Sequence, residues 1–99
     1  MTKEIIEQII SKNKTVLVDF YAPWCGPCKM LKNILQNIEK KYPNVSFIKI
    51  NVDDDAEIAH FFNISSIPAI FIYNEQKLVS SFKGFRDEEY ISNELSKLN

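Results

Sequence analysis

Apolar positions repeat with a helical period in four stretches of the chain. Residues 2–12 place their isoleucines on one stripe, with Thr2 as a candidate N-cap, and this spacing predicts an amphipathic helix. Residues 28–42 carry the strongest helical repeat, which stops before a proline. We expect a short helix over residues 56–62 and a last one over residues 87–98, whose acidic first turn suits the positive end of a helix dipole.

Four other stretches are rich in β-branched and aromatic residues, which favour strands; they are residues 15–21, 45–52, 69–73 and 78–82. The first is apolar on both faces except at Asp19, a pattern typical of a central strand covered on both sides. The last alternates apolar and polar positions, as expected for an edge strand that a hairpin joins to its predecessor.

The order of these elements, α-β-α-β-α-β-β-α, indicates an α/β fold. Strands that alternate with helices imply a parallel pair joined by a right-handed crossover, whereas the final hairpin implies an antiparallel pair. We therefore expect one domain over residues 1–99, with a mixed sheet between two helical layers. The sheet should have four strands, with strand 45–52 at one edge; a fifth strand would require residues 1–4 to be extended.

Charge and hydropathy exclude two classes of partner. Lysine and arginine number 12 against 13 aspartates and glutamates, so no strong field favours nucleic acid or an anionic membrane. No stretch approaches the roughly 20 apolar residues of a membrane-spanning helix. Residues 1–13 mix charges among their isoleucines and lack the core of a signal peptide. We expect a cytoplasmic protein.

The two cysteines, Cys25 and Cys28, are the most informative residues. A disulfide between them would close almost no loop, so its value would be chemical and not structural. Both lie where a strand runs through a short loop into the longest predicted helix, and positions three apart share one helical face. Cys25 falls near the N-cap, where unpaired backbone N–H groups stabilise a thiolate. Gly26 permits a tight bend, and Pro27 fits the first helical turn.

A metal half-site and two idle thiols are the competing interpretations of this pair. A zinc or iron–sulfur centre needs four ligands. The chain offers two cysteines and His60, which falls on a different predicted helix. We therefore expect no metal, and interpret His60 as a solvated residue beside two core aromatics, Phe61 and Phe62.

Asp19 interrupts an otherwise apolar strand a few residues before the cysteines. Burial disfavours a charged carboxylate and should raise the pKa of Asp19. Such a carboxylate could accept the proton of Cys28 when that thiol becomes a nucleophile. The alternative is an aspartate that is hydrogen-bonded for structure or that points to solvent.

The segment Val-Asp-Phe-Tyr-Ala-Pro-Trp-Cys-Gly-Pro-Cys-Lys at residues 18–29 resembles the active-site signature of the thioredoxin family. Further matches follow in the family's order at residues 49–53, residues 67–69 and Gly84, so the resemblance spans nearly the whole chain. It implies a thioredoxin fold and a dithiol reductase in which Cys25 attacks a substrate disulfide and Cys28 resolves the mixed disulfide.

The resemblance also implies partners. Substrates would be disulfide-containing proteins, and a flavin-dependent thioredoxin reductase would supply electrons to a monomer that holds no cofactor beyond its redox-active cysteine pair. An oxidase or isomerase, and a binding module without turnover, are the other hypotheses. Gly26 and Pro27 between the cysteines favour the reductase.

Roles for further residues follow from the same resemblance. Lys49 would pair with Asp19, although a surface position is the commoner fate of a strand lysine. The Ile67–Pro68 bond would be cis and lie against the cysteines, leaving the backbone of Ile67 free to pair with an extended substrate. The expected substrate surface comprises Trp24, Gly26, Pro27, Ile67, Pro68 and Gly84. The sequence departs from the family's common pattern at Tyr21, Asn33, Ser66 and the turn at residues 74–77, which lacks glycine.

Overall fold

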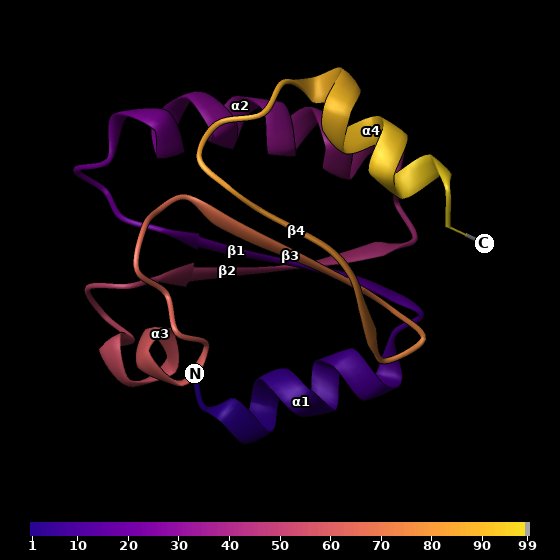
Figure 1. Cartoon of the computed structure of the whole chain (residues 1–99). Coiled ribbons are helices and arrows are strands. Elements are labelled where there is room, and N and C mark those ends of the chain that lie inside the picture. The colour runs from indigo at the N-terminus through magenta and orange to yellow at the C-terminus, as the bar shows by residue number, and fades with distance from the viewer. Residues whose placement is uncertain (99) are drawn as a thin grey trace.

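A four-stranded mixed sheet forms the middle layer of the protein in the computed structural model, which describes residues 1–98 (Figure 1). The strands lie in the order β2-β1-β3-β4. β1 runs parallel to β2 and antiparallel to β3, and β4 forms the hairpin with β3. This arrangement confirms the four strands, the mixed sheet and the edge position expected for the second strand. The strand bounds are Thr15–Tyr21 (β1), Val45–Asn51 (β2), Ala69–Asn74 (β3) and Lys77–Lys83 (β4).

Two helices cover each face of the sheet. α2 and α4 lie on one side, and α1 and α3 lie on the other (Figure 1). Thr2 caps α1 by accepting a hydrogen bond from the backbone N–H of Ile5, and Asp87 caps α4 in the same way. No helix among residues 1–98 is both long and apolar enough to traverse a membrane. The helix bounds are Lys3–Lys12 (α1), Gly26–Lys41 (α2), Ala56–Phe61 (α3) and Glu88–Ser96 (α4).

The pleat of β1 divides its side chains between two hydrophobic cores. Leu17 packs in the core beneath α2 and α4, whereas Val16, Val18 and Phe20 pack in the core beneath α1 and α3. Because alternate residues of a strand share a face, Asp19 lies on the same side as Leu17. The strand thus places its one carboxyl on the face that α2 covers.

The long helix begins at Gly26, directly after Cys25, as the expected N-cap position requires. One sequence expectation needs correction. Phe61 is not a core aromatic: its ring is half-exposed, and the ammonium of Lys3 lies 4.7 Å from the ring centroid. Phe62 packs against the core as expected. Consecutive positions at the end of a helix do not share a face, so after α3 only Phe62 is turned toward the core.

Leu31 of α2 should contribute far more to stability than an exposed leucine. Its side chain is buried in the core beneath α2 and α4, so Leu31→Ala should lower the free energy of unfolding by about 2–5 kcal/mol. The matched control is Leu78→Ala on β4, where the side chain is half-exposed; its cost should stay below about 1 kcal/mol. Urea denaturation measures both. Similar losses for the two variants would contradict the assignment of this core.

Candidate active site

The loop between β1 and α2 delivers the cysteines to the first turn of the helix. The backbone N–H of Cys25 donates to the carbonyl of Ala22 at 3.2 Å, which closes the turn before the helix. Cys25 is the N-cap of α2, and Pro27 stands in the first turn, where its missing N–H costs no hydrogen bond. The position inferred from sequence for Cys25 is confirmed.

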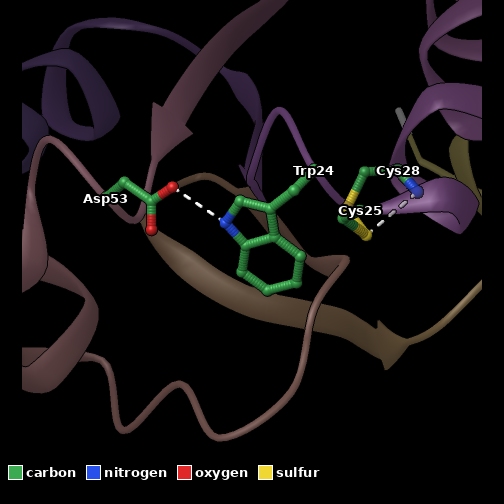
Figure 2. The surroundings of a disulfide bond; sticks show 4 residues. All are labelled: Trp24, Cys25, Cys28 and Asp53. Atoms are coloured by element: carbon green, nitrogen blue, oxygen red, sulfur yellow. Dashed lines mark hydrogen bonds between the residues drawn. A yellow bond between two sulfur atoms is a disulfide. The ribbon is translucent and has the colours of Figure 1, made fainter.

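Cys25 and Cys28 are joined by a disulfide, with their Cα atoms 5.2 Å apart. The Sγ atom of Cys25 accepts a hydrogen bond from the backbone N–H of Cys28 at 3.2 Å (Figure 2). Only 5% of Cys25 and 7% of Cys28 are exposed. A sulfur held at a helix N-terminus and contacted by a backbone donor is stabilised as an anion, so the bond can open to give a thiolate. No cluster of three or more potential metal ligands occurs within residues 1–98.

Residues remote in sequence surround the disulfide. Ile67 packs against the cysteine pair, and the Ile67–Pro68 peptide bond is cis, as expected. The carbonyl of Pro68 accepts a hydrogen bond of 2.8 Å from the N–H of Gly84, which adopts a φ of 83°. A residue with a Cβ rarely adopts that angle. Ile67, Pro68 and Gly84 are therefore brought together beside the sulfurs.

Trp24 lies on the open side of the site. Its side chain is 68% exposed, and its indole N–H donates to a carboxylate oxygen of Asp53 at 2.9 Å. Figure 2 shows the indole between Asp53 and the cysteines. Sequence reasoning assigned no role to Asp53. Its place within the matched segment at residues 49–53 was the available signal, but nothing local linked it to Trp24.

Asp19 and Cys28 line one cavity of about 320 Å³ beneath α2. Asp19 is only 7% exposed, and its Oδ1 atom has no hydrogen-bond partner among the described residues. Burial raises the pKa of Asp19 to about 6, and the nearby charge of Lys49 opposes this rise. The direction of this shift agrees with the sequence prediction. The carboxyl thus exchanges protons close to neutral pH, and it faces the same space as Cys28.

The direct pairing of Lys49 with Asp19 is wrong. The two residues are neighbours across the β1–β2 ladder, and Lys49 also lines the cavity. Its ammonium, however, forms an ion pair of 2.9 Å with Glu39 of α2, and none with Asp19. Lys49 is exposed, so its long side chain reaches a hydrated carboxylate without the cost of entering the core.

Comparison with known proteins identifies the family. A family model described as Thioredoxin matches residues 1–97. The chain belongs to the thioredoxin family. A thioredoxin of Chlamydia pneumoniae is 40% identical over 82 residues, which cover 83% of this chain and 80% of that protein. The crystal structure of oxidised mitochondrial thioredoxin 3 from Saccharomyces cerevisiae superposes with a TM-score of 0.87 at 28% identity, covering 96% of this chain and 89% of the other.

A third relative comes from work on thiol resolution in a yeast mitochondrial 1-Cys peroxiredoxin via glutathione and thioredoxin systems. That chain superposes with a TM-score of 0.90 at 27% identity, covering 98% of this chain and 91% of the other.

Membership of the thioredoxin family and the bonded cysteine pair establish thiol–disulfide oxidoreductase activity. The pair can accept two electrons by opening and return them by closing, because Cys25 and Cys28 are already at disulfide distance. Opening and closing require little movement of the backbone, since Cys25 caps α2 and Cys28 lies in its first turn.

Replacing Asp19 in this thioredoxin-family protein should make it more stable at neutral pH. A rise in pKa from 3.8 to about 6 corresponds to about 3 kcal/mol. Below pH 3.8 the carboxyl is protonated in folded and unfolded chains alike and costs nothing. Between 3.8 and about 6 the unfolded chain loses its proton first, so stability falls as the pH rises.

Asp19→Asn should therefore be more stable than the wild type by about 3 kcal/mol at pH 7 and by almost nothing at about pH 4. Urea denaturation at several pH values measures the difference. Asp54→Asn, at an exposed aspartate, is the control and should show no comparable trend. A stability difference for Asp19→Asn that stays constant with pH would refute the raised pKa.

Proposed function

We propose that this protein reduces disulfides in other proteins, with Cys25 as the attacking thiolate and Cys28 as the resolving thiol. The observation that carries the proposal is the Sγ atom of Cys25 at the N-cap of α2, in contact with a backbone N–H of the first turn. The same helix end keeps Cys25 available as the thiolate, which is the form that attacks a disulfide.

The reaction proceeds in two exchanges. The thiolate of Cys25 attacks one sulfur of the substrate disulfide, the substrate bond breaks, and the departing sulfur takes a proton from solvent. Asp19 then accepts the proton of Cys28 through the cavity that both residues line. The thiolate of Cys28 attacks Cys25, the mixed disulfide breaks, and the substrate leaves with two electrons. In this proposal Lys49 acts on Asp19 only through its charge.

The substrate surface consists of Trp24, Gly26, Pro27, Ile67, Pro68 and Gly84. Its support is the packing of Ile67 against the cysteines and the exposure of the indole of Trp24. Within residues 1–98, the backbone N–H and C=O of Ile67 form no hydrogen bond. An extended substrate segment can satisfy both groups by pairing alongside Ile67, as in strand addition.

We further propose that the chain works as one monomeric domain over residues 1–99 in the cytoplasm and is recharged by a flavin-dependent thioredoxin reductase. Membership of the thioredoxin family supports the recharging step, and one structural relative comes from work on a mitochondrial peroxiredoxin and thioredoxin systems. No metal or cofactor takes part, because the cysteine pair itself carries the two electrons.

The central test is the reduction of insulin with dithiothreitol as electron source. The wild type should accelerate insulin precipitation, and Cys25→Ser should abolish the acceleration because the attacking thiolate is lost. After it is pre-reduced and dithiothreitol is removed, Cys28→Ser should form a mixed disulfide with insulin that persists in mass spectra, since no thiol remains to resolve it. Cys25→Ser and Cys28→Ser variants that bind a partner normally, beside an inactive wild type, would indicate a binding module instead.

Asp19→Asn should slow insulin reduction mainly at neutral and higher pH. A carboxyl with a pKa of about 6 is ionised and able to accept a proton above that pH, and general base catalysis contributes about a hundredfold or more. We expect at least a tenfold loss of single-turnover rate at pH 8, with KM for insulin changed less than about twofold. Asp54→Asn is again the control, and equal rates for Asp19→Asn and wild type from pH 6 to 9 would exclude Asp19 from the mechanism.

A further inference from the structure

Arg86, the only arginine of the chain, holds a turn beside the active site. We call this set of contacts the clamp. Its Nη1 atom donates to the carbonyl of Lys83 at 3.1 Å and to that of Phe85 at 2.9 Å. These two acceptors lie on either side of Gly84, so the guanidinium ties both ends of this turn to one point. Charge-assisted hydrogen bonds of this kind hold a backbone more firmly than neutral ones.

Two aromatic rings hold the guanidinium in turn. Its Cζ atom lies 5.3 Å from the ring centroid of Phe82 on β4 and 5.5 Å from that of Tyr90 on α4. The rings meet edge to face at 90°, with centroids 5.5 Å apart. Arg86 therefore interacts with the end of the edge strand, the loop and the start of the last helix. Its planar cation suits two ring faces in a way that a lysine ammonium does not.

The clamped loop contacts the proposed substrate surface directly. The N–H of Gly84 donates to the carbonyl of Pro68 at 2.8 Å, and the next residue, Phe85, is a large apolar side chain that remains 38% exposed. Without the contacts of Arg86, the backbone around Gly84, whose φ is positive, would be free to move. The position of Phe85 would then vary with it.

We propose that Arg86 is a positioning residue that fixes the Gly84–Phe85 turn and thereby makes Phe85 part of the surface that selects extended apolar segments of protein substrates. This inference rests on the proposed function, because it concerns how a protein disulfide is held against Cys25. It adds two residues that neither the periodicity of the sequence nor its active-site signature singled out.

Two other roles would leave different traces. If Arg86 attracted substrates by its charge, Arg86→Lys would react like the wild type. Lys83→Ala, which removes another exposed positive charge, would then also slow the reaction. If Arg86 only stabilised the fold, Arg86→Ala would lower stability without discriminating between large and small disulfides. The clamp predicts that Arg86→Ala lowers the rate constant only for substrates that are large enough to touch the loop.

The experiment compares second-order rate constants of the pre-reduced protein with insulin and with the small neutral 2-hydroxyethyl disulfide. Arg86→Ala and Phe85→Ala should each react about three- to tenfold more slowly with insulin, the range expected from losing one ordered contact surface. Both should react with 2-hydroxyethyl disulfide at the wild-type rate and keep the wild-type reduction potential. Arg86→Lys should remain impaired, whereas Lys83→Ala, which keeps the carbonyl acceptor, should not be.

Equal slowing with both disulfides, or full recovery in Arg86→Lys, would overturn the clamp. An unchanged insulin rate in Arg86→Ala would do the same. A wild type that fails to reduce insulin at all would instead refute the proposed function, so the two failures are distinguishable. Thermal unfolding of each variant shows whether a slower rate reflects a partly unfolded population.

Discussion

Unpaired backbone N–H groups at the first turn of α2 are the feature on which the chemistry depends. They attract negative charge, and Cys25 places its sulfur among them as the N-cap, 3.2 Å from the N–H of Cys28. β1 and α2 are both anchored in the hydrophobic cores that flank the sheet, so the loop between them presents the sulfur in a fixed position. The stability of the sheet and the reactivity of the thiol are therefore coupled.

The buried carboxylate of Asp19, at the centre of the fold, lowers the stability of the protein. β1 is buried along almost its whole length, and its pleat turns this carboxyl toward the cavity beneath α2. Burial with no hydrogen-bond partner on Oδ1 among residues 1–98 destabilises the ionised carboxylate. The same burial brings the pKa of Asp19 near neutrality, where a carboxylate can take up and release a proton during exchange. Lys49 moderates this effect from a distance, because its ammonium is held by Glu39.

The proposed substrate surface is assembled from separate parts of the chain. Trp24 precedes α2, Ile67 and Pro68 precede β3, and Gly84 follows β4. Asp53, in the loop after β2, holds the indole by one hydrogen bond. Each of these positions follows or precedes a strand end, so the register of the sheet determines how they meet. A change in that register would separate them even if every local element formed.

Local physics in the sequence determined much of this protein. Helical and strand periodicity gave the order and approximate bounds of the elements, because the burial of an apolar face imposes those periods. The cysteine spacing beside Gly26 and Pro27 located the reactive turn. The position of Asp19 in an otherwise apolar strand was enough to predict that its pKa is raised. Only the tertiary structure decided contacts between distant segments: Lys49 with Glu39, Trp24 with Asp53, and Arg86 with the rings of Phe82 and Tyr90. Such contacts depend on where long polar side chains reach once the strands are in register, and an exposed ion pair or cation–π contact is too weak to leave a periodic trace in the sequence.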